Sequence, residues 1–376
     1  MLRTIGDHCE TLGYAAAGHK PQENVVFSPV SSCMALGMLA AGVSNDAEKE
    51  LTTLLGAPLS EVHSALKGYA DTLRAFNTDP ASIKDNKLPA RPAIHRANQV
   101  VVSTKFVPNP DFLSKVKSFY DSDAVTADLA SPQAKTLLDK WVNQHTGGRV
   151  KRSAIAPNAL LRLVLQDAVL FAAAWEMPFT PTTDKLTFRT AKGKTVKVAQ
   201  LAHSATFNYA SVDGWQAVRL PYKSPDNAKE FSALFILPPS NDTALTLDIK
   251  KRLLSGLKPV QVDLQMPKIK LRSTTDLKPV LEKLQVKSIF DHSTKPLLGV
   301  STAAAQEDLE VSSITQQAMI DVTEQGTVAA AVTEVGISTT ALPVDPVKLV
   351  FDRPYTMLIL HDPTNIALFQ TSVREL

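Results

Sequence analysis

Apolar side chains recur every three or four positions through much of the first 150 residues, and this spacing predicts amphipathic helices. The helices are expected at residues 3–17, 31–42, 46–55, 60–77, 109–120 and 131–146. Residues 78–92 are polar and proline-rich and are expected to form a loop, whereas 98–103 are expected to form a strand. The near-continuous apolar run over 161–175 is typical of a strand buried on both faces.

After about residue 180 the pattern changes to alternation of apolar and polar side chains, which predicts strands. They are expected at 195–201, 206–211, 215–220, 230–237, 260–272, 317–325, 347–351, 355–361 and 366–373, with one helix at 275–284. Helices concentrated first and strands later favour an α+β fold. No linker divides the chain, so residues 1–376 are expected to form a single domain.

Composition excludes several classes of protein. The chain has 376 residues, 44% of them hydrophobic and 20% charged, which suits a large folded core. The net charge of +3 is small and the basic clusters lack interleaved aromatic residues, so no nucleic-acid partner is expected. No run of about twenty apolar residues occurs, so no membrane-spanning segment is expected either.

The two cysteines, Cys9 and Cys33, are too few for a disulfide framework. We expect free thiols, which favours a reducing compartment. The first residues form an amphipathic pattern rather than the apolar core of a signal peptide. The sequence as given therefore predicts an intracellular protein, or a secreted one if a signal peptide has been removed.

Signatures of enzymes are missing from the sequence. It contains no GxSxG, HExxH, CxxC or GxGxxG pattern, and its eight histidines show no metal-ligand spacing. We therefore expect no catalytic residues, no metal and no cofactor.

Several separated motifs together resemble one family, the serpins. They are NVVFSPVSSCMALGMLAAG (24–42), LLDKWVNQHTGGRV (137–150), LVLQDAVLFAAAWEMPF (163–179), VRLPY (218–222), MPKIKL (266–271), EQGTVAAAVT (324–333) and FDRPYTMLIL (351–360). The resemblance covers nearly the whole chain in the family's order.

The resemblance implies a serpin fold with three β-sheets, eight to nine helices and an exposed reactive-centre loop at about 324–346. It also implies inhibition of a serine or cysteine protease by a suicide-substrate mechanism. The protease cuts the loop and forms an acyl-enzyme, and the cut loop inserts into the central sheet as a new strand and distorts the protease. The native fold is then metastable, with a stability set by rates.

The loop resembles an inhibitory hinge, formed by Gly326, Thr327 and the three alanines Ala329, Ala330 and Ala331. If residues 327–336 become a strand inside a sheet, their side chains alternate between two faces. Thr327 then belongs to a small, uncharged set that faces the core, and Glu334 to the set that faces solvent. A shift of one residue would bury the charge of Glu334 at a cost of several kcal/mol.

The reactive bond is expected at Thr340-Ala341, because in inhibitory relatives it usually follows the fifteenth residue counted from the hinge glycine. The bonds Ala341-Leu342 and Thr339-Thr340 are the neighbouring alternatives. No lysine, arginine or aromatic residue occurs from Thr327 to Val347. The target is therefore expected to be an elastase-like or subtilisin-like protease with a pocket for small residues.

Two further groups of residues are implied by the resemblance. Lys268 and Glu324 match a family ion pair where the loop enters the sheet, and Trp175 matches a tryptophan packed nearby. A second cluster lies where the sheet strands part, and there Ser31 matches the family's serine. Asp167 and Gln316 stand where the family has asparagine and histidine, and we expect the three side chains to form a hydrogen-bonded trio.

The alternative function is that of a non-inhibitory serpin acting as a carrier, chaperone or storage protein. Such members tend to carry charged, bulky or proline residues in the hinge, which this chain lacks. The protein is expected to be a monomer whose mobile strand allows loop–sheet polymerisation. Scattered basic residues between 60 and 100 are weak support for a sulfated-polysaccharide cofactor; they are Lys67, Arg74, Lys84, Lys87, Arg91 and Arg96.

Overall fold

The structure is a computed structural model that describes residues 2–83, 88–225, 228–241, 243–301, 308–327 and 345–376. Within these ranges there are eight α-helices: α1 Leu2–His19, α2 Pro29–Ala40, α3 Asn45–Leu55, α4 Leu59–Thr72, α5 Pro110–Tyr120, α6 Pro132–His145, α7 Leu247–Gly256 and α8 Lys278–Lys283. Short 3₁₀ helices lie at Arg74–Phe76, Pro80–Ser82, Ser288–Phe290 and His292–Thr294.

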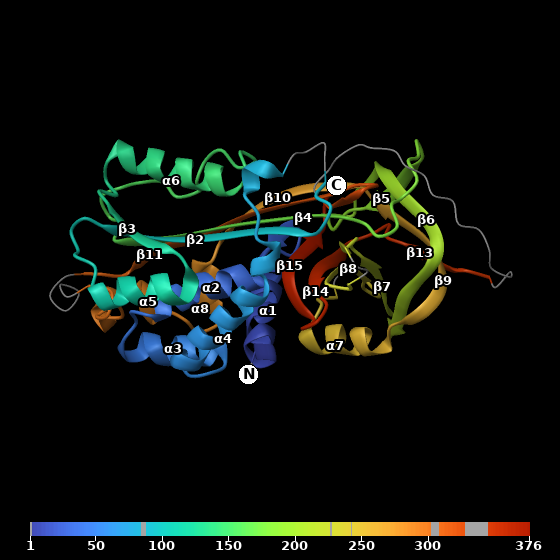
Figure 1. The fold of residues 1–376 in the computed structure, drawn as a ribbon. Helices are drawn as coiled ribbons and strands as arrows, with labels where there is room; N and C mark the ends of the chain where they lie inside the picture. Colours follow the sequence, from blue (N-terminus) through green and yellow to red (C-terminus); the bar gives the residue numbers. More distant parts are fainter. Residues whose placement is uncertain (1, 84–87, 226–227, 242, 302–307, 328–344) are drawn as a thin grey trace.

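A six-stranded sheet runs through the half of the molecule that holds most helices (Figure 1). Its order is β10 (Ile269–Asp276), β11 (Val311–Val322), β12 (Gly326–Thr327), β4 (Leu163–Ala174), β2 (Ala93–Ser103) and β3 (Asp123–Ala127). Helix α6 covers one face, where Leu138 packs with Val101 and Val164. Helix α2, buried along its whole length, packs against the opposite face. This coverage explains why β4 is buried at almost every position.

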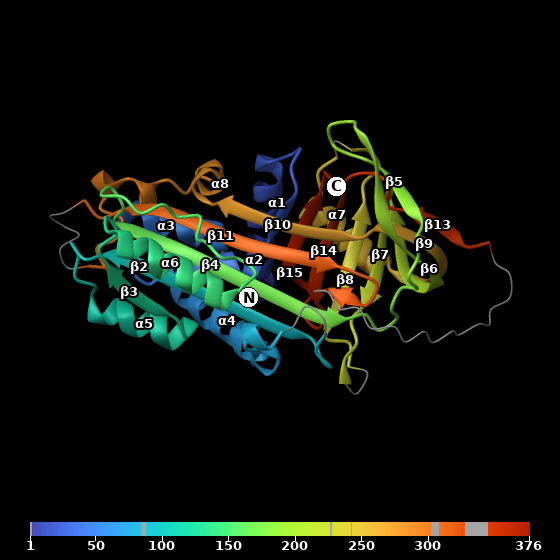
Figure 2. The same cartoon turned by 90° about the horizontal axis from the view of Figure 1, so that it is seen from above.

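Strands β4 and β11 form the seam on which the functional site depends. They pair in parallel from Val311 opposite Leu163 to Ala318 opposite Val169. Beyond this point β12 lies between them, because Thr327 pairs with Val322 of β11 and also with Ala173 of β4. Strands β4 and β11 are thus hydrogen-bonded to each other at one end of the seam, and at the other end they separate around β12 and form a fork. Figure 2 shows the two strands side by side from above.

The remaining strands form a nine-stranded sheet at the other end of the molecule. The order is β1 (Val25–Phe27), β15 (Ile366–Val373), β14 (Tyr355–His361), β8 (Phe231–Leu237), β7 (Trp215–Pro221), β6 (Thr195–Val212), β9 (Lys258–Pro267) and β13 (Val347–Val350), with β5 (Lys185–Arg189) also paired to β6. The second and third sheets expected from the resemblance are continuous here, since the 18-residue strand β6 pairs with β5, β7 and β9.

Most expected elements are present, but several boundaries differ. The helix expected at 60–77 ends at Thr72, and the helix expected at 275–284 begins only at Lys278, because residues 275 and 276 belong to strand β10. The two strands expected at 195–201 and 206–211 are one strand. The strand expected at 260–272 is divided into β9 and β10. Helix α7 and the strands β3 and β5 were not predicted.

The expectation of free thiols is wrong, because Cys9 of α1 and Cys33 of α2 form a disulfide with a Cα–Cα distance of 5.7 Å. The helices pack together, so two residues separated by 24 positions in the sequence come into contact. Both cysteines are buried in the core. The argument from free thiols for a reducing compartment therefore no longer holds.

Replacing both cysteines by alanine is expected to lower the free energy of unfolding by about 3 kcal/mol, since the closed loop restricts the unfolded chain. The loss should appear as a lower urea concentration at the midpoint of the first unfolding transition. Iodoacetamide under denaturing conditions should label the parent protein only after reduction. Labelling of two thiols without reductant would contradict the pairing.

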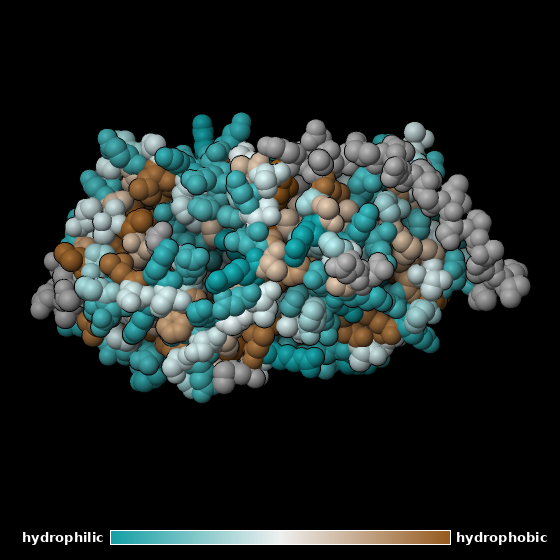
Figure 3. All heavy atoms as spheres, in the orientation of Figure 1, coloured by the Kyte–Doolittle hydropathy of each residue, from teal (hydrophilic) through white to brown (hydrophobic). Residues whose placement is uncertain are grey.

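The described helices include none that is long and apolar enough to cross a membrane. On the face seen in Figure 3, hydrophobic side chains occur in several small groups among hydrophilic ones. The most exposed large apolar side chains, Leu160 at 77% and Val107 at 70%, come from separate segments.

Candidate functional site

The site begins at the fork between β4 and β11, where β12 is hydrogen-bonded to both strands. Gly326 fits there because it has no side chain: a Cβ at this position would overlap the carbonyl oxygen of Ala173. Thr327 follows with an exposed fraction of 1%. The first two residues of the expected hinge therefore already occupy a middle position in the sheet. The other hinge residues, Ala329, Ala330 and Ala331, lie outside the described residues.

Thr327 points into the core, as alternation predicted. Its hydroxyl lies 2.6 Å from the hydroxyl of Tyr222, and both groups are buried. The ring of Tyr222 stacks on Trp175 with a centroid distance of 4.5 Å and an interplanar angle of 10°. Burial raises the pKa of Tyr222, so its hydroxyl stays neutral and can share a proton with Thr327. Tyr222 ends the VRLPY motif, but its contact with the hinge was not predicted.

The chain segment before the hinge is held by backbone contacts. Trp175 N donates to Gln325 O at 2.8 Å, and its indole Nε1 donates to Thr323 O at 3.0 Å. Phe179 N donates to Glu324 O at 2.8 Å. Trp175 therefore lies at the loop entry, as the resemblance implied, and it binds the turn as well as filling the core.

Lys268 and Glu324 form the expected ion pair, with Nζ 2.8 Å from Oε2. Partial burial raises the pKa of Glu324, but a hydrogen bond from Lys268, one from the backbone N–H of Glu324 and the charge of Lys268 together hold the pKa below its ordinary value. The side chain of Lys268 is 39% exposed and that of Glu324 is 21% exposed, so solvent screens the attraction between the two charges.

Replacing Lys268 by alanine is expected to lower the free energy of unfolding by only about 0.5 kcal/mol at neutral pH. The stabilisation of Glu324 is present above the pKa of an unfolded carboxylate and is lost as the pH falls through its lowered folded value. The difference between parent and variant should therefore disappear in acid, which urea unfolding at about pH 7 and pH 3 would check. A difference that persists at pH 3 would contradict this role.

The second group of expected residues lies along the closed part of the seam. Ser31 Oγ donates to Asp167 Oδ1 at 2.5 Å, and Gln316 Nε2 donates to Asp167 Oδ2 at 2.5 Å. These are the hydrogen bonds predicted for the trio. Gln316 and Asp167 are also directly paired in the register of β11 and β4, so the amide and carboxylate bridge the two strands.

Two residues of the cluster were not predicted. Gln316 Nε2 also lies 2.8 Å from Ser32 Oγ and 3.0 Å from Ser28 O, so its two protons are shared among three acceptors, and its Oε1 accepts from Ser28 N at 2.6 Å. Gln316 therefore satisfies both ends of its amide while it links β11 to the start of α2. The motif FSPVSS contains both serines, and their position at a helix start beside Ser31 was the available signal.

The carboxylate of Asp167 is fully buried, and burial raises its pKa to about 6. Hydrogen bonds from Ser31, Gln316 and Ser32 and the charge of Arg96 lower the pKa, but by less. At neutral pH the cluster thus contains a buried negative charge, and the free-energy cost of burying it depends on the hydrogen-bond donors around it.

Other residues singled out from the sequence do not form a site in the described chain. Thr340 and Ala341 lie outside the described residues. Lys67 and Arg74 both pair with Asp71, and Arg91 stacks over Phe76. Arg96 lies beside Met34 and near Asp167. The described basic residues between 60 and 100 therefore make local contacts rather than one basic surface.

Comparison with known proteins agrees with this architecture. The sequence profile of the family described as "Serpin (serine protease inhibitor)" matches residues 9–376. "Glia-derived nexin" from Rattus norvegicus is 28% identical over 374 residues, covering 95% of this chain and 88% of that protein. "Leukocyte elastase inhibitor" from Bos taurus is 28% identical over 371 residues, covering 93% of each chain.

A solved structure is also similar, that of Serpin48, described as "a highly specific serpin in the insect Tenebrio molitor". It has a TM-score of 0.81 and 26% identity, and the match covers 100% of this chain and 98% of that one. The fold and the profile define the class: proteins of this kind are protease inhibitors rather than enzymes, and they bind serine proteases. The chain belongs to the serpin family.

Proposed function

We propose that this serpin inhibits elastase-like or subtilisin-like serine proteases by offering Thr340-Ala341 as the reactive bond. After cleavage, the residues that follow Thr327 insert between β4 and β11 and carry the bound protease with them. The inhibitor is consumed in the process, since each molecule is cut once.

The observation that carries this proposal is the geometry of the fork. Gly326 and Thr327 are already paired with β4 and β11, and Thr327 is buried. Insertion would then extend an existing short strand along the seam rather than start a new one. Each added residue gains backbone hydrogen bonds on both sides, as in other cases of strand addition.

The sequence of the loop supports both the mechanism and the target class. Residues 327–333 are small or β-branched and carry no charge, so they suit a buried strand. The residues around the expected bond, ISTTAL, suit a shallow pocket and not one built for lysine, arginine or aromatic side chains.

The test is incubation with an elastase-like serine protease at near-equimolar ratio, followed by a denaturing gel and mass spectrometry of the released peptide. A band that survives denaturation, with a C-terminal peptide beginning at Ala341, is the expected result. A peptide beginning at Thr340 or Leu342 would move the bond by one residue. Complete cleavage without a covalent band would contradict inhibition of this class and favour a non-inhibitory serpin acting as a carrier, chaperone or storage protein.

A further inference from the structure

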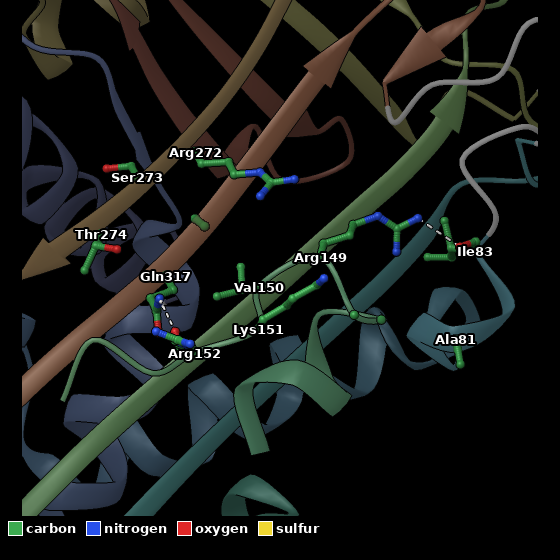
Figure 4. A pocket seen from close by; sticks show the side chains of 13 residues that line it. Ala81, Ile83, Arg149, Val150, Lys151, Arg152, Arg272, Ser273, Thr274 and Gln317 are labelled. Carbon is green, nitrogen blue, oxygen red and sulfur yellow. Dashed lines mark hydrogen bonds between the residues drawn. The ribbon is translucent and has the colours of Figure 1, made fainter. Parts of the chain in front are cut away.

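A large open pocket with a volume of about 1090 Å³ lies beside the C-terminal end of α6. Its walls come from the segment after α6, from β10 and from β11, with Ile83 at its edge (Figure 4). One wall of the pocket comes from β10 and β11, and the other comes from residues 147–152, which follow α6. The chain then continues from these residues into β4. The pocket thus lies over the β11–β4 seam and away from the hinge.

The pocket is strongly basic. Arg149, Lys151 and Arg152 line it from the segment after α6, and Arg272 lines it from β10. Among the described residues that line it there is no aspartate or glutamate. Figure 4 shows Arg272 and Lys151 extending over β11 and β4.

Arg272 differs in its surroundings from the cations at the start of β10 and just before it. Lys268 pairs with Glu324 and Lys270 pairs with Asp321, so two of the three exposed cations over residues 268–272 have a carboxylate partner. Arg272 is the next exposed position and points to the same face, yet it forms no ion pair with a described carboxylate. Several cations gathered in one hollow repel one another unless an anion joins them.

The chemistry of the lining indicates the class of ligand. Guanidinium groups donate two parallel hydrogen bonds to phosphate or sulfate oxygens, and an ammonium group adds a point charge. The exposed Thr274 provides a further polar group. The volume is large enough for a small molecule.

We propose that this pocket binds a small polyanion bearing two or more phosphate or sulfate groups, which joins Arg272 to Lys151 and Arg152 across the seam. One tie across this region already exists: Gln317 of β11 donates to Arg152 O at 3.1 Å and accepts from Ala154 N at 3.2 Å. The anion adds a second tie, so it opposes separation of β4 and β11. This consequence, unlike the binding itself, rests on the proposed function, in which the two strands must part.

Binding is tested by titration calorimetry on the intact protein with tripolyphosphate and, separately, with sucrose octasulfate at constant ionic strength. The double variant Lys151→Gln/Arg272→Gln should bind roughly 100-fold more weakly, about tenfold for each cation removed. The control Lys283→Gln/Arg189→Gln loses the same charge at exposed positions outside the pocket and should bind like the parent.

Absence of saturable binding by both probes would overturn the proposal, and so would equal weakening in the pocket variant and the control. The proposed effect on strand separation has its own readout, which is the fraction of protein that forms a covalent complex rather than cleaved product. Saturating anion should lower this fraction in the parent and not in the pocket variant. Binding without this change would overturn only the claim that the anion opposes separation of β4 and β11. If no covalent complex forms even when anion is absent, the proposed function is contradicted instead.

Discussion

Replacing Thr327 by arginine is expected to convert the protein from an inhibitor into a substrate. Thr327 is buried between β4 and β11, so the arginine must either bury its charge or hold the start of the loop out of the fork. With the start of the loop held out of the fork, insertion must bury the arginine, and a penalty of about 3 kcal/mol then slows this step roughly 100-fold. The acyl-enzyme then has time to hydrolyse before the loop has inserted.

The matched control is Val328→Arg, because alternation assigns this neighbouring position to the opposite set, which faces solvent. The measurement is the number of inhibitor molecules consumed per protease molecule inactivated, with the loop-cleaved product followed on a gel. The Thr327 variant should be cleaved with little inactivation, whereas the Val328 variant should inhibit like the parent. Equal effects of the two substitutions would contradict the predicted orientation.

Replacing Gln316 by leucine is expected to lower the free energy of unfolding more than replacing the two cysteines or Lys268 does. The loss should also depend on pH. The change removes an amide that donates to Asp167 and leaves Ser28 N without its acceptor. At about pH 7.5 the buried carboxylate is charged, and losing this donor together with the contacts to Ser28 and Ser32 costs about 4 kcal/mol. At about pH 5 the carboxyl group is mostly protonated, and the cost falls to about 2 kcal/mol.

The sign follows from the raised pKa of about 6 for Asp167. The folded state binds more protons than the unfolded state between roughly pH 4 and pH 6, so the contribution of this group to stability falls as the pH rises through that window. Loss of the Gln316 donor raises the folded pKa further and extends the window upward. Urea unfolding of parent and variant at both pH values measures the difference.

Gln317→Leu is the control, because this neighbouring glutamine bonds to backbone groups of Arg152 and Ala154 and to no carboxylate. Its substitution should cost less than about 1 kcal/mol, and equally at both pH values. If the loss caused by Gln316→Leu were the same at pH 5 and pH 7.5, Asp167 would not be the group that Gln316 stabilises.

The parts of the fold that the sequence predicted best are those with strong local patterns. Alternation placed β14 and β15 at their observed bounds, and the apolar run at 161–175 corresponds to the buried strand β4. Helix α7 was missed because its buried face contains Lys250, which pairs with Glu10 in the core and so disguises the apolar stripe.

The sequence indicated two contacts of the site: Glu324 and Lys268 match a family ion pair, whereas Asp167 and Gln316 depart from the family's asparagine and histidine and still form the expected hydrogen bond. The sequence could not indicate the fork itself, because it depends on the pairing of β4 with β11 and β12, which come much later in the chain. Nor could it reveal the basic pocket, since Arg272 lies about 120 positions from Lys151 and only the sheet brings them to the same hollow. The disulfide was missed for the same reason, because the packing of α1 on α2 decides it.

The central claim is that the cut loop inserts between β4 and β11, and thermal unfolding before and after cleavage tests it most directly. The loop would be cut with a subtilisin-like protease, the protease removed, and both forms followed by circular dichroism. About ten inserted residues with net hydrogen-bond gains of roughly 0.5–1 kcal/mol each should raise Tm by on the order of 10 °C. An unchanged or lower Tm in the cleaved protein, with its C-terminal fragment still bound, would contradict insertion.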